Sequence, residues 1–236
     1  MISVVMATFN GEKYVKRQLE SILCQLDTDD EVIVSDDGSV DNTLSIITKL
    51  ASVDPRIKVI NGPHKGYNKN FENAIKYAKG EYIFISDQDD VWMPNKISII
   101  LNNFKLNPQV KCIRHDCIVV DDNDNVIIDS YNAYRKSNTD YKSNIVKNTF
   151  TGCCMCVEAE WLKKLIPFPN EIFYDAWIGI LSCKYNKTMI IDNKLIKWCR
   201  HEGTVTNAKK RNSLIHILKN RCDLYRNIRK KCKELL

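Results

Sequence analysis

Residues 2–39, ISVVMATFNGEKYVKRQLESILCQLDTDDEVIVSDDGS, decide the fold class. Ile2–Ala7 is an apolar run of strand length, and Tyr14–Gln25 then places its apolar side chains at helical spacing. Glu31–Ser35 is a second apolar run of strand length. An apolar strand, an amphipathic helix and another apolar strand are typical of a parallel sheet buried under helices.

The same alternation continues to about residue 110. Further strands are predicted at Ile57–Ile60 and Glu81–Ser86, and further helices at Thr43–Leu50, at Asn70–Ala78 and from Pro94 onward. Parallel strands joined by helices need right-handed crossovers. The sequence therefore predicts an α/β fold with a Rossmann-like, mostly parallel sheet and helices on both faces.

From Lys111 the pattern changes. Lys111–Val120 and Val126–Asp129 flank an Asp- and Asn-rich stretch, which predicts a hairpin. Ser130–Asn148 is polar and aperiodic, which predicts a mobile loop. The elements expected after it are a strand, two helices, a strand and a basic C-terminal helix: Phe150–Val157, Glu158–Leu165, Asp175–Lys184, Thr188–Ile191 and the chain beyond residue 207.

Composition limits the class of protein. The 236 residues are 44% hydrophobic and 27% charged, as in ordinary soluble globular chains. No apolar run approaches the roughly 18–20 residues needed to span a bilayer. The N-terminus has no basic stretch, so we expect no signal peptide, and ten cysteines without one suggest reduced thiols in a cytoplasmic protein.

The positive charge is concentrated in a C-terminal tail. The net charge is +6, but residues 208–236 hold ten Lys and Arg against two acids, which leaves the first 207 residues slightly negative. We therefore expect no nucleic-acid partner from the overall charge. The tail is predicted to be a basic amphipathic helix, which either contacts an anionic membrane surface or packs on its own domain.

Polar residues follow the predicted strands where the strands end, at the edge where such sheets bind ligands. Asp, Asn and Gly are also common turn formers, so each loop alone is weak evidence. Five carboxylates from two of these loops would nevertheless repel one another, and a divalent cation, Mn²⁺ or Mg²⁺, suits their oxygen ligands. These edge residues are Thr8, Asn10, Glu12, Asp36, Asp37, Asp87, Gln88, Asp89 and Asp90.

Several of these segments resemble, in order and spacing, motifs of glycosyltransferase family 2 with the GT-A fold. Val4–Gly11, Ser35–Ser39 and Ser86–Trp92 carry the resemblance in the first half, and Thr151–Cys153, Tyr174–Trp177 and Arg200–Gly203 carry it in the second. Within that family, the sequence resembles bacterial rhamnosyltransferase-like members most. The resemblance implies a GT-A domain over residues 1–207, with a nucleotide-sugar-binding half, 1–110, and an acceptor-binding half, 111–207.

The resemblance also implies roles for individual residues. Asp89 would be the main metal ligand, with Asp87 at the metal or the donor ribose and His201 near the metal or the diphosphate. Asp175 would be the catalytic base. The nucleotide-sugar pocket would include Thr8, Asn10, Glu12, Asp36, Asp37, Gly66, Asn70, Asp87 and Gln88, with Asp37 accepting a hydrogen bond from the base. Trp92 and Trp177 either pack in the core or form a platform for the acceptor.

Two positions depart from the family pattern. Tyr174 stands where many relatives have His or Glu, and the stretch Trp198–Gly203 is shifted from the commoner Tyr-Arg-x-His-Gly form.

The function implied by the resemblance is inverting, metal-assisted transfer of a sugar from a dTDP- or UDP-sugar, with dTDP-rhamnose as one candidate donor. The acceptor would be a hydroxyl of a saccharide or lipid-linked glycan in cell-surface polysaccharide synthesis, at the cytoplasmic side of the membrane. Alternatives are a catalytically inactive nucleotide-sugar-binding module and a nucleotidyltransferase. The latter would need a Gly-rich basic phosphate loop after the first strand, which Thr8–Lys13 matches poorly.

Cysteine spacing offers one further alternative. Cys153 and Cys156 could form a zinc site with Cys112 and Cys117. On a strand, however, Cys153 and Cys156 would point to opposite faces, so we expect buried thiols instead.

Overall fold

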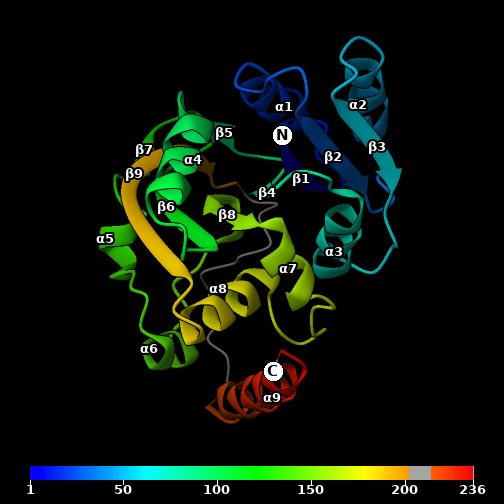
Figure 1. The fold of residues 1–236 in the computed structure, drawn as a ribbon. Helices are drawn as coiled ribbons and strands as arrows, with labels where there is room; N and C mark the ends of the chain where they lie inside the picture. The colour runs from blue at the N-terminus through cyan, green and yellow to red at the C-terminus, as the bar shows by residue number, and fades with distance from the viewer. Residues whose placement is uncertain (202–213, 236) are drawn as a thin grey trace.

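The computed structural model describes residues 1–201 and 214–235, with the backbone alone for 214–220 (Figure 1). Its predicted parallel core is confirmed: β1 (Ile2–Thr8) lies between β2 (Glu31–Asp36) and β4 (Tyr82–Ser86), and β3 (Ile57–Asn61) pairs with β2, all parallel. The connecting helices are α1 (Val15–Leu23), α2 (Thr43–Ala51) and α3 (Tyr67–Tyr77).

Strands of the second half extend the same sheet in the order β3-β2-β1-β4-β8-β6-β9-β5. The strand β8 (Met155–Glu158) is antiparallel to both β4 and β6 (Cys112–Val120). The hairpin of β6 and β7 (Val126–Ile128) is confirmed. The strand β9 (Thr188–Cys199) runs far beyond the predicted Thr188–Ile191, because it pairs along the whole of β6 and with β5 (Val91–Trp92). Its length carries the chain back to the edge of the sheet where β4 ends.

Of two other predictions for the second half, one is wrong and one is confirmed only in part. Residues 130–148 contain the helices α5 (Tyr131–Arg135) and α6 (Tyr141–Val146), whose N-caps Ser130 and Asp140 accept backbone hydrogen bonds. These caps were visible in the sequence, but such short helices have no periodicity to reveal them. The predicted strand at 150–157 is confirmed only for its second half, as β8, because Gly152–Cys154 form a 3₁₀ turn.

Helices cover both faces of the sheet, as predicted. The helices α1, α2 and α4 (Lys96–Leu106) pack on the face to which Val4 and Met6 point. On the other face, Val5 packs with α3, α7 (Ala159–Leu165), α8 (Tyr174–Lys184) and part of α9 (Leu214–Glu234). Because side chains alternate along β1, this strand contributes residues to two separate cores, one on each face of the sheet.

The described part of the basic tail packs on the domain. Leu224 and Ile228 of α9 are buried in the second core, at 4% and 1% exposure. No helix in the described ranges combines the length and apolar character that crossing a membrane requires. The predicted boundary at residue 207 lies outside the described residues.

All ten cysteines are free thiols, and seven are buried. The prediction that Cys153 and Cys156 point to opposite faces of one strand is wrong. Cys153 belongs to the 3₁₀ turn, and both side chains lie in the first core. The expectation of buried thiols holds for Cys112, Cys117, Cys153 and Cys156.

Candidate active site

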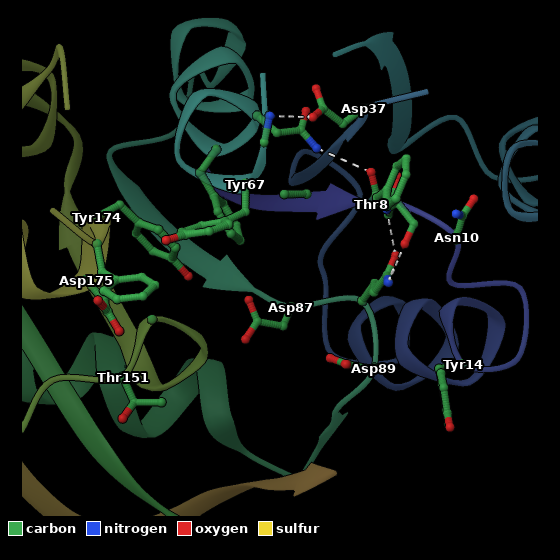
Figure 2. A pocket seen from close by; sticks show the side chains of 18 of the residues that line it. Thr8, Asn10, Tyr14, Asp37, Tyr67, Asp87, Asp89, Thr151, Tyr174 and Asp175 are labelled. Carbon is green, nitrogen blue, oxygen red and sulfur yellow. Dashed lines mark hydrogen bonds between the residues drawn. The ribbon is translucent and has the colours of Figure 1, made fainter. Parts of the chain in front are cut away.

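A cavity of about 790 Å³ opens at the carboxyl edge of β1 and β4. Figure 2 shows Thr8, Asn10 and Asp37 along one part of its wall and Tyr67, Tyr174 and Asp175 on the opposite side. Asp87 and Asp89 lie below both groups in this view, with Asp89 on the side of Tyr14. Segments far apart in the sequence thus meet as the parallel topology predicts.

The loop after β2 is held by its own carboxylate. Asp36 accepts hydrogen bonds from Thr8 Oγ1 (2.9 Å), Ser39 N (2.8 Å) and Ser39 Oγ (2.6 Å), and it does not line the cavity. Glu12, also outside the cavity lining, accepts from the backbone and side chain of Asn42. In this structure Asp36 and Glu12 therefore hold their loops together, and their predicted role in nucleotide-sugar binding stays a prediction.

Asp37 does line the cavity and joins two loops. Its carboxylate accepts from His64 N at 2.7 Å and from Gly66 N at 2.8 Å, which ties the β2 loop to the start of α3. Gly66 has φ of +80°, a conformation that favours glycine. Asn70 lies one turn further on, where its amide donates to the carbonyl oxygens of Ser35 (2.7 Å) and Thr8 (3.3 Å).

Gln88 joins the loops after β1 and β4. Its amide accepts from Phe9 N and donates to Phe9 O, each at 3.0 Å. A Cβ at Gly11 would lie 2.3 Å from Gln88 Oε1, so the contact requires glycine there. Asn10, at φ of 49°, accepts from Val40 N at 2.9 Å. Gln88 and Asn10 both line the cavity, with their amides already engaged in these loops.

Asp89 and His201 meet at the floor of the cavity. The two side chains are 2.9 Å apart (Oδ2 to Nε2), and the imidazole stacks on Tyr14 with ring centroids 4.4 Å apart. The segment that carries His201 is anchored by Asp90, whose Oδ1 accepts from Cys199 N at 3.2 Å. The other members of the sequence motif, Glu202 and Gly203, lie outside the described residues.

The surroundings of Asp87 disfavour the ionised form of its carboxyl group. Burial and the charge of Asp89 raise its pKa to about 7. Among the residues that the structure describes, Asp87, Asp90 and Cys153 form a group whose potential ligand atoms lie within 4.8 Å of one another. Oδ2 of Asp90 is buried there without a hydrogen-bond partner. Clustered carboxylates and an adjoining imidazole fit a divalent cation, which would offset the repulsion. Asp87 turns towards Asp90 and Cys153, so the three predicted ligands do not form one compact set.

Asp175 lies in the first turn of α8, and Ala176 N donates to its Oδ1 at 2.6 Å. Burial raises its pKa to about 6, although backbone N–H groups of Ala176 and Gly152 oppose the shift. A carboxylate with a pKa near neutrality is suited to accept a proton during a reaction. Tyr174, which precedes it, is buried and approaches Gly152 so closely that a Cβ there would clash with its hydroxyl.

The two tryptophans predicted to form an acceptor platform lie in the core. Trp92 is 4% exposed and stacks under the Lys96 ammonium, and Trp177 is 2% exposed with its Nε1 donating to Leu165 O. Neither lines the cavity, so neither is available to a ligand.

Several aromatic residues that line the cavity were not predicted from the sequence, and three of them share a position in the fold: Tyr14, Tyr67 and Phe173. Each stands at or beside the start of a helix, where side-chain periodicity carries no signal. Tyr67 follows the glycine of a loop already singled out, which is the one local clue.

Comparisons with known proteins bear on the family and the fold of the chain. The family model described as Glycosyl transferase family 2 matches residues 3–166. A protein of Nostoc sp. named as an uncharacterised glycosyltransferase is 31% identical over 182 residues, 75% of this chain and 56% of the relative. The Escherichia coli enzyme UDP-Glc:alpha-D-GlcNAc-diphosphoundecaprenol beta-1,3-glucosyltransferase WfgD is 28% identical over 185 residues, 77% of this chain and 70% of that one. The dTDP-rhamnosyl transferase RfbG of Shigella flexneri is 40% identical over 109 residues, covering 42% and 38% of the two chains.

Solved structures show the GT-A fold. TarS residues 1–349 from S. aureus, in complex with UDP-GlcNAc, has a TM-score of 0.71 at 19% identity, covering 97% of this chain and 65% of that one. The mannosyltransferase PcManGT from Pyrobaculum calidifontis, in complex with GDP-Man and Mn²⁺, has a TM-score of 0.60 at 18% identity, covering 81% and 54%. The chain spans little more than half the length of the Nostoc relative and smaller parts of several others.

Proposed function

The chain belongs to glycosyl transferase family 2, and we propose that it transfers a sugar from a nucleoside diphosphate to a hydroxyl of a saccharide or lipid-linked acceptor, with inversion. One observation carries the proposal. A single cavity holds loops suited to a nucleotide, paired carboxylates, and a separate carboxylate, Asp175, on the far side.

The donor is proposed to be a UDP- or dTDP-sugar, dTDP-rhamnose included. Uracil and thymine both carry an imide N–H that needs an acceptor. Each carboxylate oxygen of Asp37 keeps a lone pair beyond its bond to His64 N or Gly66 N. The names of two relatives support this donor class, one using UDP-Glc and the other a dTDP-rhamnosyl transferase.

Asp175 is proposed as the general base. It would take the proton of the acceptor hydroxyl as that oxygen attacks the anomeric carbon, while the bond to the nucleoside diphosphate breaks on the opposite face. A single displacement leaves no covalent sugar on the protein. Its pKa of about 6 keeps the carboxylate ionised at neutral pH yet basic enough to share the proton.

Asp89, Asp87 and His201 are the residues proposed to hold Mn²⁺ or Mg²⁺. When bound, such an ion neutralises negative charge that develops on the departing diphosphate. The Asp89–His201 contact and the raised pKa of Asp87 support this assignment. We further propose that the reaction serves cell-surface polysaccharide synthesis at the cytoplasmic face of the membrane.

Thermal unfolding with UDP, dTDP, GDP and CMP, each with and without Mn²⁺, tests the donor site. A nucleotide at about 100 times its Kd stabilises the fold by about 2.7 kcal/mol. We expect a metal-dependent shift with UDP or dTDP that Asp89→Ala abolishes. A well-folded protein that shifts with none of these nucleotides would contradict the proposal and favour a degenerate binding module.

The base is tested separately with Asp175→Asn. This variant should keep the nucleotide shift and lose transfer, because the amide cannot accept the proton. Full transferase activity in the variant would remove Asp175 from the mechanism.

A further inference from the structure

Tyr67 and Phe173 form a stacked aromatic pair in the wall of the cavity. Tyr67 begins α3, and Phe173 directly precedes α8. Their ring centroids are 5.5 Å apart, with planes inclined by 18°. Phe173 is nevertheless 56% exposed and Tyr67 37% exposed. Large aromatic surfaces gain free energy when they leave water, so an exposed pair inside a cavity points to a ligand.

The pair lies on the side of the cavity that holds Asp175. Both residues line the cavity together with Asp175, and the charge of Asp175 contributes to the raised pKa of Tyr67. Figure 2 shows Tyr67 beside Tyr174 and Asp175, with Thr8 and Asn10 further away across the cavity. Tyr67 directly follows Gly66, whose N–H donates to Asp37, so the pair also adjoins the loop that carries Asp37.

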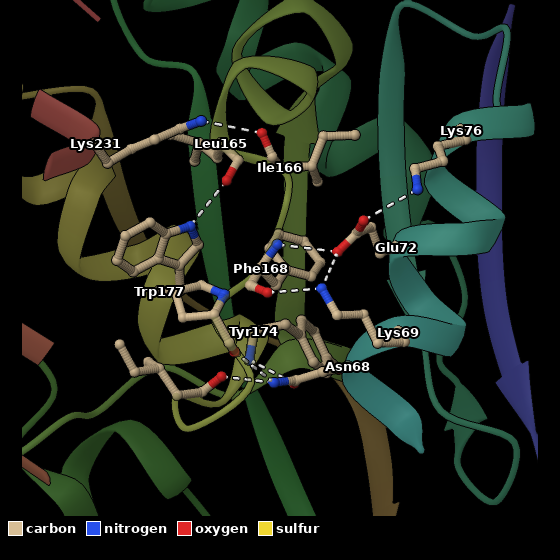
Figure 3. Close-up of polar contacts among 12 residues, drawn as sticks. Asn68, Lys69, Glu72, Lys76, Leu165, Ile166, Phe168, Tyr174, Trp177 and Lys231 are labelled. Atoms are coloured by element: carbon tan, nitrogen blue, oxygen red, sulfur yellow. Dashed lines mark hydrogen bonds and ion pairs between the residues drawn. The ribbon is translucent and has the colours of Figure 1, made fainter. Parts of the chain in front are cut away.

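A polar network, drawn in part in Figure 3, ties the segment that carries Phe173 to α3. The side chain of Asn68, next to Tyr67, donates to Ile172 O at 2.6 Å and accepts from Tyr174 N at 3.0 Å, so it holds the two residues that flank Phe173. Glu72, 6% exposed, accepts from Phe168 N at 3.0 Å and pairs with Lys69 at 2.9 Å. The exposed aromatic surface is thus held in place from α3.

The chemistry of this surface suits a sugar ring. One face of a pyranose presents C–H groups, while the hydroxyls project mainly from its edge. The C–H face packs on an aromatic ring, and a hydroxyl at the edge remains free to reach a neighbouring carboxylate. The Tyr67 hydroxyl, with its pKa raised to about 12 by burial, stays protonated and can donate a hydrogen bond.

We infer that Tyr67 and Phe173 bind the C–H face of an acceptor pyranose and present one of its hydroxyls to Asp175. The inference rests on the proposed function and replaces the buried tryptophans as the acceptor platform. It assigns a saccharide, and not a lipid chain, to this part of the cavity.

Saturation-transfer NMR tests the inference without knowledge of the natural acceptor. The probes are methyl glycosides of glucose, galactose, N-acetylglucosamine and rhamnose, added with UDP and the diamagnetic ion Mg²⁺. We expect strong transfer to the ring protons of one face of at least one glycoside. Phe173→Ala and Tyr67→Ala should each weaken its binding by about tenfold, the effect of losing one aromatic contact. Tyr67→Phe should retain most of the binding.

Tyr77→Ala is the matched control, because Tyr77 is a 55% exposed tyrosine at the other end of α3. It should bind the glycosides like the parent protein. Absence of transfer to every glycoside in the parent protein, or equal transfer in Phe173→Ala, overturns the inference. So does a variant that loses affinity for UDP-sugars while its glycoside binding is unchanged.

The UDP-dependent thermal shift separates the two levels of the argument. If UDP and Mn²⁺ raise the unfolding temperature of the parent protein but Phe173→Ala binds the glycosides equally well, only the aromatic platform fails. If the UDP shift itself is absent, the proposed function fails with it.

Discussion

Asp175 has the residue-level property with the most direct consequence for activity. Its pKa of about 6 means that the carboxyl is largely protonated below that pH and cannot act as a base. We expect kcat/KM for transfer to rise about tenfold per pH unit up to about pH 6 and then to level off. The measurement is a pH profile of the initial rate between about pH 5 and pH 8, with a saturating donor and the acceptor well below its KM. A profile without this rise would show that another group limits the reaction.

The same shift has a consequence for stability. The pKa of Asp175 is raised from 3.8 in the unfolded chain to about 6, so the native state binds more protons between these values. Stability therefore falls as pH rises through this window, and the loss is complete above pH 6. We expect the free energy of unfolding of Asp175→Asn to exceed that of the parent by about 1–3 kcal/mol at pH 8. At pH 5 the difference between the two proteins should be smaller.

Urea unfolding at the two pH values measures this difference. Asp29→Asn, at an exposed loop carboxylate, is the control and should change stability little at either pH. An Asp175→Asn variant that is destabilised at pH 8 would mean that the carboxylate is stabilising in its site.

At the scale of elements, the first half was predictable because buried parallel strands carry continuous apolar runs. The strands at Ile2–Ala7, Glu31–Ser35 and Glu81–Ser86 needed only local pattern, and their topology then placed Asp37, Asp87 and Asp89 in the wall of one cavity. The 130–148 helices and the length of β9 depend on partners distant in sequence. Asn132, for example, is buried by contacts with Asp116 and Ile191, which no local pattern encodes.

Helix α8 depends on α3 for its N-terminus. Phe173, at the N-cap position, supplies no side-chain hydrogen bond, and Asn68 of α3 accepts from Tyr174 N instead. Asn68→Ala would leave that N–H and the carbonyl oxygen of Ile172 without partners in a buried place. We expect a loss of about 2 kcal/mol in unfolding free energy and a lower kcat, because Asp175 is the next residue of the helix.

The nucleotide shift should survive in Asn68→Ala, since the Asp37 loop is unchanged. Asn68→Asp, which keeps the acceptor for Tyr174 N, should recover part of the lost kcat. A kcat equal to that of the parent in Asn68→Ala would show that α8 is held adequately by its other contacts.

At the scale of the whole molecule, the basic tail is the feature that composition alone could not place. The tail is predicted to be an amphipathic helix, and the structure buries its apolar side chains Leu224 and Ile228 against the domain. Those side chains are therefore not available for insertion into a bilayer. Arg226, Arg229, Lys230 and Lys233 remain exposed on the same helix.

Any contact of this helix with a membrane must then be mainly electrostatic. We expect the protein to bind vesicles that contain anionic phospholipid, with affinity that falls steeply between about 0.1 M and about 0.5 M salt. Each exposed cation contributes about 1 kcal/mol near such a surface. The triple variant Arg229→Glu, Lys230→Glu, Lys233→Glu should therefore bind at least about a hundredfold more weakly in a vesicle sedimentation assay.

A second triple variant separates the helix from the net charge of the molecule. Lys16→Glu, Lys49→Glu and Lys105→Glu change the charge by the same amount at exposed positions on α1, α2 and α4. If the long-range field of the whole protein governs binding, the two triple variants will lose affinity equally. If α9 forms the contact, only the Arg229, Lys230 and Lys233 variant will lose affinity. The charges on the other helices are then too far away, because at about 0.1 M salt charges more than about 10 Å from the surface are screened. Parent protein that fails to sediment with anionic vesicles would leave α9 as a packing element of the domain alone.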